Sequence, residues 1–491
     1  MTLARLAQAA GLALPDGADG STGVTGFAID NRKVAPGTVF GAFRGAKFNG
    51  EDFIPAAIDA GAVAVVAAPG VRVDGAIHIA DPEPRRAFAL LAAQFFMPVP
   101  EVIVAVTGTN GKTSNVEMTR QLWRMAGHSS ASIGTLGVTT PDGSISTGLT
   151  TPDIVTFLSN MHGLAREGVS HVAYEASSHG LSQYRNEGLP VAAGAFTNLS
   201  RDHLDYHGTM EEYFAAKMRL FDEVVSEGGH AIIWNGGDEW ARRACEHAHK
   251  RDLRVFTVGE QGDNIRLLAR SPSQLGQELV IAYEGQERKV HLPLIGAYQA
   301  ANALVSAALV IATGGDANAT FDALGRLQPV RGRLERAAIS AAGAPIYVDY
   351  AHTPDALEAA IAALRPHVTG RLITVFGAGG DRDKGKREPM GRVAAELSDI
   401  VIVTDDNPRG EEAAAIREAV MQGAKGATEI GDRREAIATA ILQAGPDDIV
   451  LIAGKGHEQG QIVGAGDAMR ILPFDDVEVA RECAIPQGAA Q

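Results

Sequence analysis

The feature that most constrains the fold is a short segment in which an apolar strand leads into a glycine loop and then into a helix. Ile103-Val104-Ala105-Val106 precedes the loop TGTNGKTS at residues 107–114, and a helical stretch follows over residues 116–125. Small loop residues let backbone N–H groups approach phosphate oxygens, and the amino end of a helix favours negative charge. The segment predicts a parallel α/β sheet that carries a nucleotide phosphate site.

Within this loop the predicted ATP contacts are Gly108, Thr109, Asn110, Gly111, Lys112, Thr113 and Ser114. Lys112 would meet the β- and γ-phosphates, and the Thr113 hydroxyl would ligate Mg²⁺. The general pattern of such loops has glycine where Val106 stands, so this loop is a variant. A phosphate loop alone is equally compatible with hydrolases, kinases, motors and ligases.

The rest of the chain repeats the alternation of strand and helix. Apolar β-type runs at residues 63–67, 102–106, 191–197, 346–348, 372–376 and 400–404 alternate with Ala- and Leu-rich helical stretches, which is typical of parallel α/β sheets. A chain of 491 residues suggests about three domains. Segments that contain proline and glycine near residues 97 and 329 are expected to be linkers. The predicted domains are therefore residues 1–97, 98–328 and 329–491.

Composition excludes several other functions. Acidic residues outnumber basic ones by 59 to 44, which disfavours electrostatic binding to nucleic acid or to an anionic membrane. Only Cys245 and Cys483 occur, so no disulfide framework is expected. The amino terminus reads as a short amphipathic helix rather than a signal peptide, and no segment is long enough to span a membrane. We expect a soluble, cytoplasmic protein.

Polar residues gather after two further strands. Glu175 follows the apolar run 172–174 and is the first candidate for a Mg²⁺ ligand beside the phosphate loop. Asp405-Asp406-Asn407-Pro408-Arg409 follows the run 400–404. The Arg409 guanidinium and the Asn407 amide can donate hydrogen bonds to a carboxylate of a ligand. The carboxylates of the two aspartates can accept hydrogen bonds from an ammonium group.

Seven motifs in one order resemble the Mur ligase family: GTNGKTS, EASSHGL, TNLSRDHLDYHG, DYAHTPDAL, GAGGDRDKGKR, DDNPRGE and AGKGHE. The resemblance extends from about residue 27 to residue 463. It implies an α/β fold of three domains: an N-terminal UDP-binding α/β domain, a central P-loop ATPase-like parallel sheet and a C-terminal Rossmann-like α/β domain. It also implies an ATP-dependent ligase that joins an acid to an amino acid.

The resemblance assigns a catalytic set of Lys112, Glu175, His203 and Lys217. In the family the lysine matching Lys217 is carbamylated, which converts a cation into an oxygen ligand for Mg²⁺. Two Mg²⁺ ions are implied. Thr113 and Glu175 would hold the first, and Glu175, His203 and the Lys217 carbamate the second.

The substrate residues come from the same resemblance. For a UDP-linked muramoyl dipeptide they are Ile29, Asn31, Ala46, Lys47, Phe48, Thr150, Thr151, Ser177, Gln183 and Arg185. Asn31 departs from the serine usual there. Asn302, Arg333 and Asp349 would complete the ATP site, where Tyr298-Gln299 departs from the commoner Phe-Asn. Arg382, Asp406, Asn407, Pro408, Arg409, Gly454 and Glu458 would bind the amino acid.

The implied reaction adds meso-2,6-diaminopimelate to UDP-N-acetylmuramoyl-L-Ala-D-Glu, with ATP as co-substrate, through an acyl phosphate. We expect a monomer that binds neither nucleic acid nor membrane. Diaminopimelate is favoured over lysine because the family's diaminopimelate-adding members carry the Asp-Asn-Pro-Arg sequence. The alternatives are a lysine-adding ligase, a folylpolyglutamate synthase and a regulatory nucleotide-binding module without ligase chemistry. A DNA-associated ATPase is disfavoured by the acidic composition.

Overall fold

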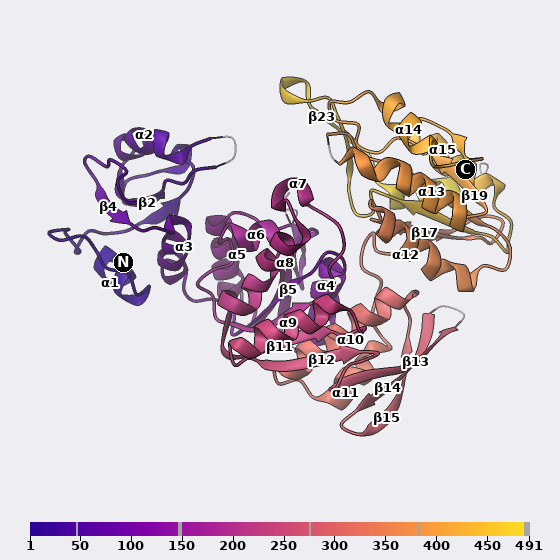
Figure 1. Ribbon diagram of the computed structural model, residues 1–491, viewed down its shortest axis with the longest axis horizontal. Helices are drawn as coiled ribbons and strands as arrows, with labels where there is room; N and C mark the ends of the chain where they lie inside the picture. Colours follow the sequence, from indigo (N-terminus) through magenta and orange to yellow (C-terminus); the bar gives the residue numbers. More distant parts are fainter. Residues whose placement is uncertain (46–47, 146–149, 274–275, 382, 486–491) are drawn as a thin grey trace. The chain divides into compact units, whose positions relative to one another are not determined.

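The computed structural model describes residues 1–45, 48–145, 150–273, 276–381 and 383–485. Ala46, Lys47 and Arg382, three of the predicted substrate contacts, lie outside these residues. The chain divides into two compact units. The first unit contains residues 1–199, 207–256 and 308–315, and the second contains residues 200–206, 257–307 and 316–491. Both are α/β structures, as the sequence predicts (Figure 1).

The first unit begins with a small parallel sheet. Its strands are β1 (Gly26–Ala28), β2 (Thr38–Gly41), β3 (Ala62–Ala67) and β4 (Ile77–Ala80), in that spatial order. Its helices are α1 (Leu3–Ala9), α2 (Ile54–Asp59) and α3 (Pro84–Phe95), with 3-10 turns η1 (Asn31–Lys33) and η2 (Gly50–Phe53). Alternate strand residues face opposite sides. Val39 and Val66 pack with α1 and α3, whereas Phe40 and Val65 pack with α2.

A second sheet in the first unit carries the phosphate loop. Its strands are β5 (Val102–Thr107), β6 (Ser130–Gly134), β7 (Gly137–Thr140), β8 (Gly143–Ile145), β9 (His171–Glu175), β10 (Val191–Phe196) and β11 (Val225–Trp234). The order β11-β10-β5-β9-β6 is parallel, and β7 and β8 add antiparallel strands. The accompanying helices are α4 (Lys112–Met125), α5 (Ile154–Arg166), α6 (Ser178–Ser182), α8 (Met210–Arg219) and α9 (Glu239–Lys250), with a π-helical turn η3 (Leu220–Val224) after α8.

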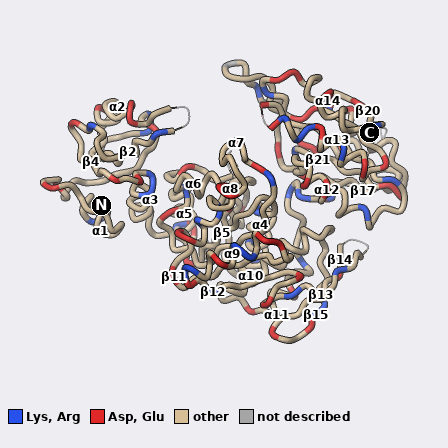
Figure 2. Tube along the Cα trace, in the orientation of Figure 1, with Lys and Arg blue, Asp and Glu red and all other residues tan. Residues whose placement is uncertain are grey.

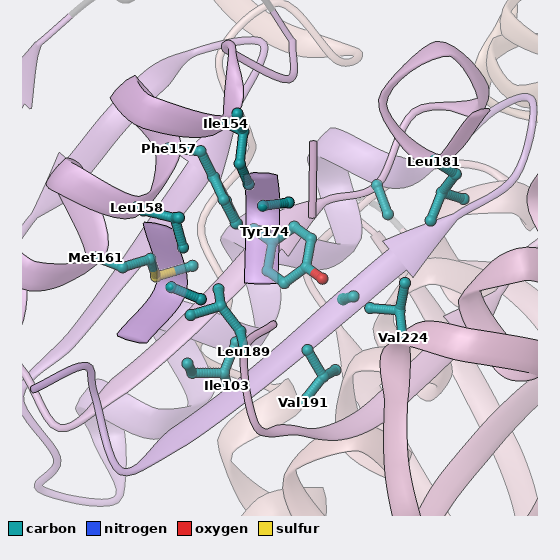
Figure 3. Close-up of a cluster of buried hydrophobic side chains, with 14 of the residues drawn as sticks. Ile103, Ile154, Phe157, Leu158, Met161, Tyr174, Leu181, Leu189, Val191 and Val224 are labelled. Carbon is teal, nitrogen blue, oxygen red and sulfur yellow. The ribbon is translucent and has the colours of Figure 1, made fainter. Parts of the chain in front are cut away.

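An apolar cluster fixes α5 against this sheet (Figure 3). Phe157 and Leu158 lie on one turn of α5 and Met161 on the next, and all three are fully buried. The Phe157 ring lies 5.0 Å, centroid to centroid, from the ring of Tyr174 on β9. The Tyr174 hydroxyl is buried with no hydrogen-bond partner among the described residues, and burial raises its pKa. The cluster therefore owes its stability to apolar contact.

The second unit begins with a strand and two hairpins. These strands are β12 (Arg254–Gly259), β13 (Ile265–Ser273), β14 (Gly276–Tyr283) and β15 (Gln286–Leu292), and β13, β14 and β15 form an antiparallel meander. The helices α7 (Leu204–His207), α10 (Ala297–Ala312) and α11 (Ala317–Leu324) also occur here. Residues of α7, α10 and β12 are divided between the two units.

The larger sheet of the second unit has the order β16-β17-β21-β18-β19-β20. Its strands are β16 (Glu335–Ile339), β17 (Pro345–Asp349), β18 (Leu372–Phe376), β19 (Ile400–Val403), β20 (Thr428–Glu429) and β21 (Ile449–Ala453). All pairs are parallel except β16 with β17. A separate hairpin joins β22 (Gly460–Val463) and β23 (Arg470–Pro473).

Helices cover both faces of this sheet. They are α12 (Pro354–Leu364), α13 (Arg387–Leu397), α14 (Ala413–Met421), α15 (Arg433–Gln443) and α16 (Asp476–Ala484). Phe376 and Leu451 pack with α12, α13 and α14, whereas Val375 and Ile452 pack with α15 and α16. Acidic and basic side chains are interspersed along the described trace (Figure 2). This sheet, covered by helices on both faces, is the predicted Rossmann-like arrangement.

The predicted strands are all present, with ends shifted by no more than a residue or two. The predicted amino-terminal helix is α1. Within the described part of the chain, no helix combines the length and the apolar character needed to cross a bilayer.

The cluster around α5 gives a stability prediction. Phe157→Ala should lower the free energy of unfolding by about 3–5 kcal/mol, because it removes a fully buried ring and leaves a cavity. Tyr174→Phe is the matched control, since it removes only a hydroxyl without a partner and should be neutral or stabilising. Urea unfolding measures both. Equal losses for the two variants would contradict this account of the core.

Candidate active site

The carboxyl ends of β5, β9 and β10 lie side by side at one edge of the central sheet. Val106 on β5 is paired with Glu175 on β9, and Thr107 is paired with Phe196 on β10. Ligands of open α/β sheets bind at this edge. The register therefore brings the phosphate loop, Glu175 and the TNLS segment together in the first unit.

The loop after β5 rests on the loop after β10. Asn198 accepts hydrogen bonds from the backbone of Thr109, through its carbonyl oxygen (3.0 Å), and of Asn110, through its side-chain Oδ1 (2.9 Å). Its side-chain Nδ2 donates to the Asn110 carbonyl, and Thr197 Oγ1 donates to the same oxygen at 2.6 Å. Gly108 has a φ of 145°, and a Cβ there would collide with Thr197 Oγ1. The loop can approach this support only with glycine at that position.

Two lysines converge on one carbonyl oxygen of the loop. Lys112 Nζ donates to Gly108 O at 2.9 Å and to Thr109 O at 2.7 Å. Lys217 Nζ, on α8, donates to Gly108 O at 2.8 Å and lies 4.3 Å from the centroid of the Tyr213 ring. Lys217 is 1% exposed. The predicted phosphate lysine and the predicted carbamylated lysine therefore meet at the same backbone atom.

Glu175 fits the predicted role of a metal ligand. Its carboxylate is 2% exposed and accepts hydrogen bonds from the Thr135 backbone (2.7 Å) and the Thr135 hydroxyl (3.2 Å). Among residues 1–45, 48–145, 150–273, 276–381 and 383–485, no group of three or more His, Cys, Asp or Glu side chains is placed to hold a metal ion by itself. Mg²⁺ is commonly held by one or two carboxylates together with substrate phosphates. Glu175 and Thr113, together with the predicted carbamate on Lys217, would supply this kind of oxygen donor set.

His203, the remaining predicted metal ligand, belongs to the short segment 200–206 of the second unit. It is half-exposed, has a φ of 53°, and places its Nε2 3.4 Å from Asp202 Oδ2.

Three predicted contacts to the UDP-linked substrate line one pocket of the first unit. Ile29, Gln183 and Arg185 share it with Phe43, Arg85, Asp153 and Ile154. Arg85 stacks over the Phe43 ring, with its Cζ 4.9 Å from the ring centroid. Two guanidinium groups beside apolar side chains suit a ligand that carries both phosphate and apolar surface.

Five predicted residues of this substrate site are connected by hydrogen bonds: Thr150, Thr151, Ser177, Gln183 and Arg185. Thr151 Oγ1 donates to Ser177 Oγ at 2.9 Å, and Arg185 donates to the Thr151 carbonyl at 2.8 Å. Arg185 also donates to Gln183 Oε1 at 2.6 Å. Thr150 accepts from the Thr135 hydroxyl at 3.1 Å, which links the set to Glu175. Asn31 begins η1, and Phe48 is largely exposed.

In the second unit the predicted ATP contacts Asn302, Arg333 and Asp349 are also joined by hydrogen bonds through neighbouring residues. Asn302 donates to Gln299 Oε1 (3.3 Å), and Gln299 donates to the Arg333 carbonyl (3.0 Å). Tyr298 donates to Asp349 Oδ2 (3.4 Å), which also accepts from the Leu334 backbone. Burial raises the pKa of the Asp349 carboxyl, against the opposing charge of Arg333 and these hydrogen bonds.

The predicted amino-acid site lies at the carboxyl ends of β19 and β21. Asn407 Nδ2 donates to Glu458 Oε2 at 2.8 Å. Gly454 has a φ of 118°, and a Cβ there would lie 3.2 Å from Asp406 Oδ2. Arg409 donates to the Gly380 carbonyl at 2.9 Å. Asp406, Asn407, Arg409, Gly454 and Glu458 are therefore neighbours, although they come from two loops.

Several residues that shape these sites were not predicted. Thr135 binds Glu175, Asn198 supports the phosphate loop, Arg85 and Phe43 line the pocket, and Lys455 contacts the amino-acid residues. Asn198 and Lys455 stand inside recognised motifs, so the motifs pointed to their neighbourhood. Arg85 and Phe43 belong to none of the seven motifs, so the sequence did not identify them as residues of a binding site.

Comparison with known proteins decides the family. The family description "Mur ligase middle domain" matches residues 106–310, "Mur ligase, glutamate ligase domain" matches residues 332–456, and "Mur ligase family, catalytic domain" matches residues 23–127. The chain belongs to the Mur ligase family. Mur ligases are ATP-dependent acid–amino-acid ligases, so the predicted family, three-domain α/β fold and enzyme class are confirmed.

Two relatives among the Mur ligases carry the same name, UDP-N-acetylmuramoyl-L-alanyl-D-glutamate–2,6-diaminopimelate ligase. The protein from Zymomonas mobilis is 61% identical over 462 residues, covering 94% of this chain and 95% of the relative. The protein from Bradyrhizobium diazoefficiens is 52% identical and covers 93% of each chain. A solved structure of a ligase with that name is 32% identical, with a TM-score of 0.72, and covers 99% of this chain and 98% of its own.

The support of the phosphate loop by Asn198 can be tested directly. Asn198→Ala removes two side-chain hydrogen bonds to Asn110 but keeps the backbone bond to Thr109. Loss of bonds worth about 0.5–1.5 kcal/mol each should speed amide exchange at Asn110 by about tenfold. Site-resolved hydrogen exchange measures this, with the Thr109 amide as the internal reference. Unchanged exchange at Asn110 would show that the side chain does not hold the loop.

Proposed function

We propose that this protein joins meso-2,6-diaminopimelate to the D-glutamyl carboxylate of UDP-N-acetylmuramoyl-L-Ala-D-Glu, with conversion of ATP to ADP and phosphate. The observation that carries this proposal is the set Asp406, Asn407, Arg409 and Glu458 gathered at the ends of β19 and β21. The 61% and 52% identical relatives bear the name of this ligase. The product is a precursor of peptidoglycan.

The amino-acid site supports diaminopimelate over lysine. The distal end of diaminopimelate carries both an ammonium and a carboxylate, whereas lysine carries only the ammonium there. Arg409 offers a guanidinium for the carboxylate, and Asp406 and Glu458 offer acids for the ammonium. Lysine has no distal carboxylate with which the Arg409 guanidinium could pair.

In the proposed reaction the γ-carboxylate of the D-glutamyl residue attacks the γ-phosphate of ATP, and ADP leaves. The amine of the diamino acid then attacks the acyl carbon of the resulting acyl phosphate, and phosphate leaves. Carboxylate and triphosphate repel each other, so cationic groups must offset their charge. Lys112 moves from the Gly108 and Thr109 carbonyls to the phosphates, while Arg85 and Arg185 bind the anionic UDP-linked substrate.

Bound Mg²⁺ would neutralise the charge that develops on the phosphate oxygens. Thr113 and Glu175 would hold one ion, and Glu175, His203 and a carbamate on Lys217 a second. The carbamate is supported by the burial of Lys217, because a buried ammonium beside Lys112 is costly and carbamylation removes that charge.

The remaining assignments belong to the same proposal. The domain boundaries are 1–97, 98–328 and 329–491, and Asn302, Arg333 and Asp349 bind ATP. The protein acts as a monomer in the cytoplasm.

The amino-acid assignment is tested by supplying the UDP-linked dipeptide, ATP and a panel of amino acids and identifying the product by mass. The wild-type protein should form tripeptide with diaminopimelate and little with lysine. Arg409→Ala should raise the KM for diaminopimelate by about 100-fold, because it removes a charged hydrogen-bonding partner, and should leave the KM for ATP unchanged. ATP hydrolysis without amide formation when diaminopimelate is present would refute the proposal.

The carbamate has a test of its own. Lys217→Ala should reduce kcat by about 100-fold or more, since it removes a metal ligand, and added acetate or formate should restore part of the activity by supplying a carboxylate. Lys217→Arg, which keeps a cation and cannot form the carbamate, should be inactive and gain nothing from these anions. A carbamate signal after incubation with ¹³C-bicarbonate should appear in the wild type and vanish in Lys217→Ala. Full activity of Lys217→Arg would exclude the carbamate.

A further inference from the structure

Lys455 is a fully buried lysine that the proposed reaction does not use. It follows β21 within the AGKGHE segment and is 0% exposed. A buried ammonium group is stable only when oxygen atoms replace its water shell. Its Nζ lies 3.0 Å from Asn407 Oδ1, 3.2 Å from Glu458 Oε2 and 3.4 Å from Asp406 Oδ1. All three partners belong to the proposed amino-acid site.

These contacts fix the geometry of that site. Asn407 Oδ1 accepts from Lys455 Nζ and from the Ile462 backbone (2.9 Å), while its Nδ2 donates to Glu458 Oε2. The amide therefore has one orientation. Strands β19 and β21 lie on either side of β18, so Lys455 joins loops that the sheet itself keeps one strand apart.

Lys455 also sets the charge of the site. Two other buried cations nearby have counter-ions of their own. Arg433 is matched by Asp476 through hydrogen bonds of 2.8 and 2.6 Å, and Arg387 is matched by Glu411 through hydrogen bonds of 3.1 and 2.9 Å. Asp406, Glu458 and Lys455 together then carry one net negative charge, beside the positive charge of Arg409. One negative and one positive centre match a distal group that is itself a zwitterion.

We propose that Lys455 is a positioning residue that determines amino-acid specificity: its ammonium cancels one of two carboxylates, so that the site accepts a zwitterionic distal group in preference to a lone ammonium. This inference rests on the proposed function. Without Lys455 the site gains one net negative charge, which repels the distal carboxylate and attracts a bare ammonium. Its effect should therefore appear as a change of preference and not only as a loss of stability.

The experiment compares kcat/KM for diaminopimelate and for lysine in purified full-length variants, at saturating ATP and UDP-linked dipeptide. Lys455→Met should lower the ratio of diaminopimelate to lysine by about tenfold or more, given the strength of charge interactions at these distances. The KM for ATP should stay unchanged. Lys425→Met is the matched control. Lys425 is an exposed lysine between α14 and β20 of the same domain, so its loss should leave the ratio unaltered.

Two more variants separate charge from folding. Glu458→Gln keeps Lys455 and removes one negative charge from a side chain that is 30% exposed, so the ratio should rise. The double variant Lys455→Met/Glu458→Gln restores the original net charge and should return the ratio toward the wild-type value. Should Lys455→Met fail to fold, Glu458→Gln, which keeps Lys455, still tests the sign of the effect.

The outcomes distinguish the two proposals. If the wild type forms tripeptide but the ratio does not move in Lys455→Met, or falls in Glu458→Gln, the inference about Lys455 is wrong and the proposed function stands. Equal losses for both amino acids, with a lower melting temperature, would assign Lys455 a purely structural role. If the wild type forms no amide with any amino acid, the proposed function itself fails.

Discussion

The meeting of two ammonium groups at the Gly108 carbonyl is the interaction on which the active site of this Mur ligase depends. Lys112 and Lys217 each donate to that oxygen, at 2.9 and 2.8 Å. Two like charges so close repel each other, and the repulsion is strong where water is excluded. In the proposed reaction a triphosphate would relieve this repulsion by drawing Lys112 away, and the proposed carbamate would relieve it by reversing the charge of Lys217. The proposed triphosphate site and the proposed modification of Lys217 would therefore relieve the same repulsion.

This arrangement follows from strand register. Because β5, β9 and β10 are parallel neighbours, their carboxyl ends meet and place Thr107, Glu175 and Thr197 at one edge. The sequence predicted this edge well, since buried parallel strands are continuous apolar runs and the polar residues after them stand out. It could not predict which side chain supports the loop. Asn198 is 88 residues from Asn110, and their contact exists only once β10 is beside β5.

The departures from the family pattern show where sequence reasoning stops. At Tyr298-Gln299 the commoner pair is Phe-Asn, so the contacts there were hard to foresee. In the structure Gln299 still provides an amide that links Asn302 to the Arg333 carbonyl, and the Tyr298 hydroxyl adds a contact to Asp349. Arg85 and Phe43 present a different case: neither belongs to a motif, and only the pocket they share with Arg185 associates them with the substrate.

Two buried cations that pack beside the C-terminal sheet, Arg433 and Lys455, show that burial alone does not reveal a role. Arg433 has a dedicated counter-ion, Asp476, and donates its remaining hydrogen bonds to backbone carbonyls, so its charge is satisfied within the fold. Lys455 is instead shared among three side chains of the proposed amino-acid site. An apolar residue could fill the same volume at no greater cost in stability, because desolvating a charge offsets much of what its ion pairs contribute. A buried charge retained at such a position is therefore better explained by what the site must recognise than by what the fold requires.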